Sequence, residues 1–164
     1  MERGGRTLTA LVVMGILGLG SSPAASSTQL SEQQLVSAQE QSLQQAINRA
    51  RTARGIPPLR IGVRLQSAAR EHSRAMARSG SFDHGDWCRR LRRHGVRGRT
   101  LGETIAWGVG VEGTASAIVG MWLASPPHRA TMLGRGFRRI GVGVATGTMS
   151  GFPGASVATA DFSG

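Results

Sequence analysis

The sequence predicts an α+β fold in which helices come first and a β-hairpin comes last. Through much of the chain apolar residues recur at three- and four-residue spacing, with glycine or proline where each run ends. Near the C-terminus, β-branched or small apolar residues alternate with glycine, which is the period of a strand. The 164 residues are enough for one domain around a single hydrophobic core.

The N-terminus is typical of a secretory signal peptide. A basic start is followed by an apolar run over 8–19 and by small polar residues over 21–27. The run is too short to cross a bilayer comfortably. No later segment reads as a membrane span, so we expect no transmembrane helix once the signal peptide is removed. The alternative is a short anchor retained after export. The predicted parts are a signal peptide over 1–26, a polar, partly helical extension over 27–42, and one domain over 43–164.

The composition is strongly basic and poor in cysteine. All 20 basic residues are arginine and the formal net charge is +11, a balance that attracts anionic lipids, envelope polymers or nucleic acid. A GC-rich coding bias explains the choice of arginine equally well. Cys88 is the single cysteine, which excludes an intramolecular disulfide, and we expect a partly buried, inert thiol there.

Two amphipathic helices are predicted before residue 80. The first starts at a capping box formed by Ser31 and Gln34 and ends at Gly55. The second covers 63–78, and Gly80 ends it. His72 lies on its apolar face, where a hydrogen-bonded core histidine is expected more often than a metal ligand.

Two further helices and a hairpin follow. Asp86 is placed to cap a short helix over 87–94, and Gly113-Thr114 to cap another that ends at Ala124 before two prolines. The strand-like runs 137–145 and 155–162 are joined by a loop rich in Gly, Ser and Thr, which favours an antiparallel hairpin. Glycines at 141 and 143 would let a helix approach that face closely.

An acid and an imidazole stand at the two ends of the stretch 102–129. Glu103 and His128, joined by His84 from upstream, could share a proton or hold a divalent metal. A second carboxylate would have to come from Glu112 or Asp161. No HExxH, phosphate-binding loop or GxSxG motif is present, so the sequence offers no established catalytic signature.

Several segments in order resemble one family. They include Ile47-Asn48-x-Ala50-Arg51, Ala69-x-x-His72-Ser73, Phe82-x-His84, Gly102-Glu103-Thr104-Ile105-Ala106-x-Gly108, Trp122-x-x-Ser125-x-x-His128-Arg129 and Ile140-Gly141-Val142-Gly143-Val144. The chain is thereby similar to the CAP superfamily (cysteine-rich secretory proteins, antigen 5 and pathogenesis-related protein 1), also called the SCP domain, in its short bacterial form.

The resemblance implies a three-layer α-β-α sandwich with a central antiparallel sheet and a surface cleft. Carried over by motif, His84 and His128 are the two cleft histidines and Glu103 is the first acid. The second acid of the family falls on Ser125, so the site is one carboxylate short. No cofactor is required; Zn²⁺ or another divalent cation is what His84, His128 and Glu103 would suit. Hydrolysis by Ser125 and His128 is not expected, because two prolines intervene and no acid is placed to orient the histidine.

The run of arginines before residue 100 is the only local concentration of charge. It is read either as a solvated face or as an anion-binding patch, and its members are Arg89, Arg90, Arg92, Arg93, Arg97 and Arg99.

The sequence therefore predicts a monomeric domain, secreted or in the cell envelope, that binds rather than catalyses. Its ligand would be a lipid, another amphipathic molecule or an anionic envelope polymer, with no specific nucleic acid as partner. One alternative is a metal-dependent hydrolase at His84, Glu103 and His128; another is a polyanion binder acting through the arginine run.

Overall fold

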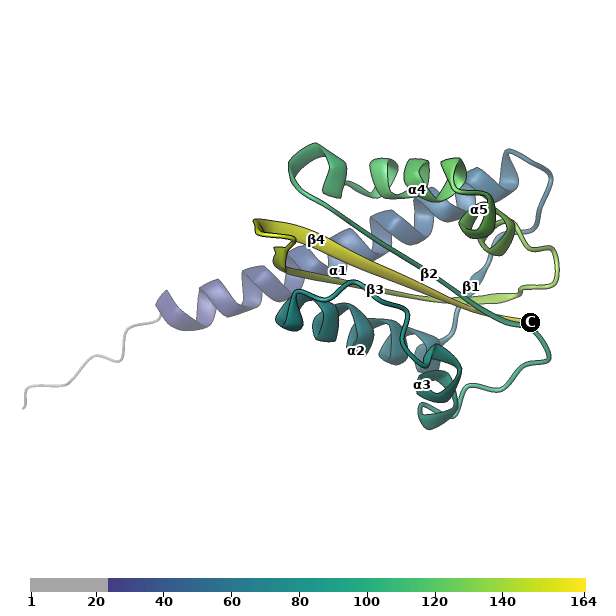
Figure 1. The fold of residues 1–164 in the computed structure, drawn as a ribbon, viewed down its shortest axis with the longest axis horizontal. Coiled ribbons are helices and arrows are strands. Elements are labelled where there is room, and N and C mark those ends of the chain that lie inside the picture. The colour runs from purple at the N-terminus through teal and green to yellow at the C-terminus, as the bar shows by residue number, and fades with distance from the viewer. Residues whose placement is uncertain (1–23) are drawn as a thin grey trace, which may run out of the picture.

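The computed structural model describes residues 24–164 as three layers, with a sheet between helices (Figure 1). The elements in chain order are α1 (Ala24–Thr52), β1 (Arg60–Ile61), α2 (Val63–Ser79), α3 (Trp87–Arg93), β2 (Leu101–Gly108), the 3-10 helix η1 (Gly110–Gly113), α4 (Ala115–Ala124), α5 (Pro126–Met132), β3 (Arg139–Met149) and β4 (Phe152–Ser163). The predicted α-β-α sandwich is confirmed.

The strand order of the sheet is β1-β3-β4-β2, which leaves β2 at one edge. Strands β3 and β4 form an antiparallel hairpin, and β2 is antiparallel to β4. The two-residue β1 pairs parallel with β3, so the sheet is antiparallel except at that short edge. The edge position of β2 matters for function, because helices of both outer layers can reach past it.

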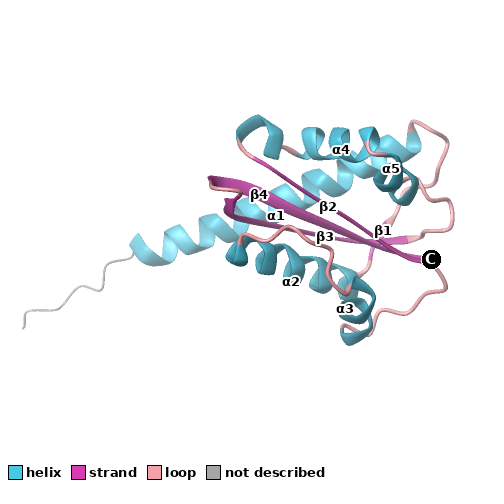
Figure 2. Ribbon diagram, viewed as in Figure 1, coloured by secondary structure: helices cyan, strands magenta, loops and turns pink. Residues whose placement is uncertain are grey.

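Helices α1, α4 and α5 cover one face of the sheet, and α2 and α3 cover the other (Figure 2). The larger core lies under the first group and joins its apolar side chains to those of β3 and β4. The buried Trp122 of α4 donates a hydrogen bond from Nε1 to the backbone oxygen of Ile105 at 2.9 Å. This bond holds α4 against β2.

Glycines in β3 bring α2 unusually close to the sheet. A Cβ atom at Gly141 would lie 2.0 Å from the backbone carbon of Leu65, and one at Gly143 would lie 2.3 Å from that of Ala69. Real Cβ atoms do not make such contacts, so only glycine fits at either position. The predicted close approach of a helix is confirmed.

Three helix ends follow the caps predicted from the sequence, whereas α1 begins before the predicted capping box at Ser31. Gly80 ends α2 in the left-handed conformation, Asp86 accepts a hydrogen bond from the Arg89 amide at 2.9 Å, and Thr114 caps α4. The hairpin differs from its prediction, because its strands continue into the expected loop and leave only Ser150 and Gly151 as the turn. Backbone pairing does not need apolar side chains, so the polar residues there do not end the strands.

Residues 27–42, predicted as a separate extension, belong to the same helix as the start of the predicted domain. α1 runs through residues 26 and 42, the two predicted boundaries, while the signal-peptide prediction lies mostly outside the described residues. Near the middle of α1, the buried Glu40 pairs with Arg70 of α2 at 2.5 Å. None of the helices in the described part of the chain combines the length and apolar character needed to cross a membrane.

Candidate functional site

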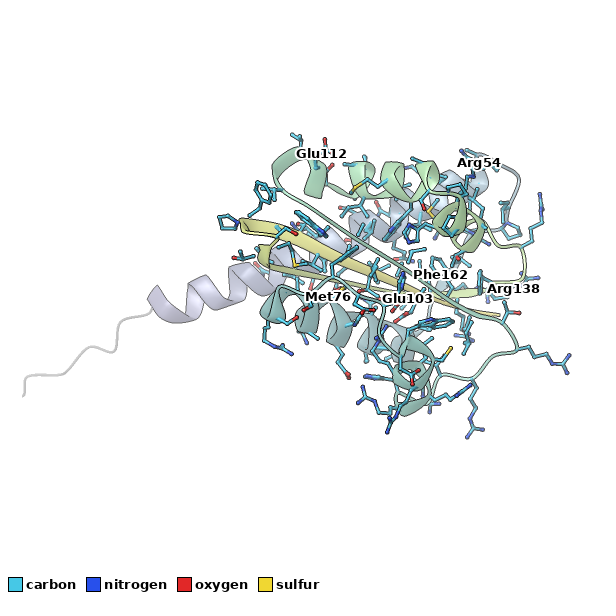
Figure 3. The ribbon with its side chains drawn as sticks, viewed as in Figure 1. Arg54, Met76, Glu103, Glu112, Arg138 and Phe162 are labelled. Carbon is cyan, nitrogen blue, oxygen red and sulfur yellow. The ribbon has the colours of Figure 1, made fainter. Side chains whose placement is uncertain are left out.

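β2 carries the acid at the centre of the candidate site. Glu103 points to the α2–α3 side of the sheet, and its side chain is only 1% exposed (Figure 3). A carboxylate this deeply buried needs donors for both of its oxygens.

Both oxygens of Glu103 have such donors. Nδ1 of His84, from the segment before α3, lies 2.7 Å from Oε1, and Nη2 of Arg90 donates to Oε2. Arg90 is itself buried, and it also donates to the backbone oxygen of His84 at 3.4 Å. The guanidinium therefore neutralises Glu103 and ties His84 to the same place.

A second carboxyl group adjoins Glu103. Asp161 of β4 lies directly opposite it in the β2–β4 ladder, so both side chains project from the same face. Asp161 has no exposed surface, and no donor from the described residues bonds to its oxygens. Burial first, and then the negative charge of Glu103, raise the pKa of Asp161 well above its ordinary value. Asp161 therefore resists ionisation beside Glu103.

His72 of α2 contributes a neutral imidazole to this buried region. It is 8% exposed, and its Nε2 has no hydrogen-bond partner among the described residues. Burial, and then the positive charge of Arg90, lower the pKa of His72. His72 is thus a core residue with one unsatisfied nitrogen.

The second predicted cleft histidine approaches from the opposite layer. The ring of His128, on α5, lies 6.1 Å from that of His84, centroid to centroid, at an angle of 44°. Burial, and then the charge of His84, lower the pKa of His128. The two histidines, which come from opposite layers, thus lie near each other, and His84 also contacts Glu103. Ser125 lies between α4 and α5, where its hydroxyl makes no hydrogen bond to any described residue.

These residues do not fit a zinc centre. Within residues 24–164, no three His, Cys, Asp or Glu side chains are arranged as ligands of one metal ion. Both Glu103 oxygens already accept hydrogen bonds, one of them from a buried guanidinium, and a cation would be repelled by that group. Of the two acids considered as a second carboxylate, the exposed Glu112 lies on η1 in the other layer, and Asp161 is fully buried (Figure 3).

The arginine run divides into three environments. Arg90 points inward to Glu103, because α3 turns that position and Leu91 toward the sheet. Arg93 pairs with the exposed Glu71 at 2.5 Å. The remaining members are exposed, and they are Arg89, Arg92, Arg97 and Arg99.

Sequence reasoning misses the roles of Arg90 and Asp161. The run of arginines places Arg90 with surface residues, although the leucine that follows it is fully buried and marks the inner side of α3. The sequence suggests Asp161 only as a spare ligand. An acidic residue among the small and apolar residues that precede Phe162 is the available signal for a buried carboxyl group with a raised pKa.

A cavity of about 620 Å³ lies on the other side of the sheet, between α1 and α4. Its apolar lining includes Leu43, Ile118 and Val144, which belong to three different elements. Polar groups at the cavity include several Gln and Ser side chains and one guanidinium, that of Arg49. An apolar floor with one cationic group suits an amphipathic anion.

Known proteins resemble this chain in sequence. The family model "CAP: Cysteine-rich secretory protein family" matches residues 44–162. The YkwD protein of Bacillus subtilis (strain 168) is 34% identical over 113 residues, which are 66% of this chain and 43% of YkwD. The chain therefore spans less than half the length of that relative.

Solved structures share the fold. An extracellular SCP-domain protein of Bacillus anthracis aligns with a TM-score of 0.65 and 25% identity over 79% of this chain and 41% of its own. A cysteine-rich secretory protein of Staphylococcus aureus gives 0.61 and 21% identity, over 76% and 38%. An outer surface protein of Borrelia burgdorferi gives 0.60 and 18%, over 73% and 87%.

Proposed function

Because the chain belongs to the cysteine-rich secretory protein (CAP) family, we propose that it is a non-catalytic binding module, secreted or in the cell envelope, for an amphipathic anion. The observation that carries this proposal is the cavity between α1 and α4. The description of the Bacillus anthracis relative as extracellular supports the location.

The cavity suits a ligand with an apolar chain and an anionic head. Leu43 and Ile118 are almost completely buried beneath it, so an alkyl chain placed against them would lose contact with water. Arg49 forms no ion pair with a described residue, and its guanidinium is free to bind a carboxylate or phosphate. Long-chain fatty acids and anionic lipids combine these two features.

The polar cluster formed by Glu103, His84 and Arg90, on the opposite face of the sheet, supports a role other than catalysis. Glu103 would be the general base of a hydrolase, but its oxygens are held by His84 and Arg90. Ser125 has no histidine hydrogen-bonded to its hydroxyl in the described part of the chain. The cluster therefore serves better as a structural contact that holds α3 against β2.

A cavity-filling variant tests the proposal. Ala115→Trp places an indole at the cavity wall, and Ala124→Trp adds the same group to an exposed site on the same helix outside the cavity. We expect a fluorescent long-chain fatty acid to bind wild type and Ala124→Trp and to lose most of its affinity for Ala115→Trp. Arg49→Gln should weaken binding less, because the apolar contacts stay. Equal affinity in both tryptophan variants, or no binding to wild type, would overturn the proposal.

A further inference from the structure

Three arginines from separate parts of the chain line a second cavity, remote from the one between α1 and α4. This cavity has a volume of about 360 Å³ and lies where the start of α2, the segment after α3 and the start of β3 meet. Arg64, Arg97 and Arg139 line it, one from each of these segments, and no acidic side chain does. None of its lining residues lines the α1–α4 cavity.

One of the three guanidiniums is held in place. Nη1 of Arg64 donates to the backbone oxygen of Gly95 at 2.8 Å. This contact uses one of its N–H groups and orients the others. Because Gly95 lines the same cavity and has a φ of +68°, the turn after α3 presents its carbonyl to Arg64 at the cavity wall.

The other two guanidiniums have no paired counter-charge within residues 24–164. Neither Arg97 nor Arg139 forms an ion pair or a side-chain hydrogen bond with any residue of the described chain, although carboxylates elsewhere are paired with arginine. Three positive groups around one cavity repel one another, and an anion between them would relieve that repulsion. Ser163, at the end of β4, lines the same cavity.

Two neighbouring features point to the same ligand charge. The cavity is also lined by Gly62, Val63 and Leu65 at the start of the 17-residue α2, whose N-cap Gly62 supplies no side-chain cap. Backbone N–H groups at that end add partial positive charge. In addition, Val63 is 77% exposed and Ile61 40% exposed, so apolar groups stand beside the cationic cavity.

We propose that this cavity binds a phosphate-bearing anion through Arg64, Arg97 and Arg139. The planar guanidinium presents pairs of N–H donors that match two phosphate oxygens, and three of them around one cavity fit a phosphate group better than a single carboxylate. The phosphate belongs either to a soluble ester or to the headgroup of an anionic phospholipid, which the exposed Val63 and Ile61 would then meet. The site is independent of the proposed function, since it uses a different cavity.

Charge-matched double variants of the full chain provide the test. Arg97→Gln/Arg139→Gln removes the two unpaired cations, and Arg74→Gln/Arg78→Gln removes the same charge from α2 outside the cavity. Inorganic phosphate, titrated at constant ionic strength with chloride as the balancing anion, is the probe. We expect it to raise the thermal midpoint of wild type and of the α2 control, with affinity at least about tenfold weaker in Arg97→Gln/Arg139→Gln.

Vesicle co-sedimentation then identifies the source of the phosphate. Binding to anionic phospholipid vesicles that is competed by phosphate and lost in Arg97→Gln/Arg139→Gln assigns a lipid headgroup. Phosphate binding without vesicle binding assigns a soluble ester. The proposal is overturned if phosphate has no effect on wild type, or if the two double variants lose affinity equally.

Discussion

Glu103 and Asp161 face each other across the β2–β4 ladder, and they are two buried carboxyl groups with only one buried guanidinium, Arg90, beside them in the described part of the chain. Burial and the negative charge of Glu103 raise the pKa of Asp161, so this acid resists ionisation in the folded chain. The two carboxyl groups therefore make the free energy of unfolding depend on pH, and substituting each one separately measures its contribution.

The first prediction concerns Asp161. Its pKa is higher in the folded chain than in the unfolded chain, so the folded state binds more protons and loses stability as pH rises above about 3.8 toward the folded pKa. Asp161→Asn keeps the shape and removes that loss. Urea unfolding at a series of pH values should show the variant gaining stability relative to wild type as pH rises through this window. A difference that does not change with pH would contradict the raised pKa.

The second prediction concerns the negative charge that neutralises the buried guanidinium of Arg90. Burial still raises the pKa of Asp161 in Glu103→Gln, but the second cause, the negative charge of Glu103, is gone. Asp161 should therefore ionise more readily beside Arg90, and the loss of stability should be partial. Glu103→Gln/Asp161→Asn leaves the buried guanidinium without any carboxylate and should cost about 3–5 kcal/mol of unfolding free energy. Adding Arg90→Met should recover part of that loss. Denaturant unfolding at neutral pH measures all three, and additive effects of the two carboxyl substitutions would refute the exchange of charge.

The third prediction concerns acid stability. The pKa of His72 lies below its ordinary value of 6.5, so the unfolded chain binds a proton that the folded chain resists. Stability from this source is complete above pH 6.5 and decreases as pH falls. His72→Asn, which is always neutral, should flatten the acid side of the stability curve. An imidazole NMR titration in which His72 protonates at or above pH 6.5 in the folded protein would disprove this.

The fourth prediction concerns the contact between α2 and β3. Gly143→Ala places a methyl group against the backbone at Ala69 and should destabilise the domain by about 1–3 kcal/mol through overpacking. Gly120→Ala is the matched control, because that glycine lies exposed in α4 with no atom near its missing Cβ. The control should gain about 0.5–1 kcal/mol from helix propensity. Thermal unfolding should show a lower midpoint than wild type for Gly143→Ala and a higher one for Gly120→Ala.

The helices and the hairpin could be predicted from the sequence because their signals are local. Asp86, Thr114 and Gly80 mark helix ends within one turn of chain, and alternation marks β3. The strand β2 gives no such signal, since it is buried on both faces and its sequence does not alternate between apolar and polar residues.

The candidate site was predictable only in part. Motif resemblance linked His84, Glu103 and His128, and the structure brings His84 to Glu103 and His128 to His84. The partnership of Glu103 with Asp161 depends on the register of two strands far apart in the chain, which no local pattern encodes. The inward turn of Arg90 likewise depends on how α3 docks beneath the sheet.

The missing side chain at Gly141 controls chemistry as well as packing. Gly141 is the other ladder neighbour of Asp161, and the backbone of α2 sits where its Cβ would be. The helix can therefore close over this row of the sheet and exclude water from Asp161. A larger residue at 141 would lift α2, admit solvent and lower the pKa of Asp161 toward its ordinary value. The raised pKa of Asp161 thus depends on the side chain that its ladder neighbour Gly141 lacks.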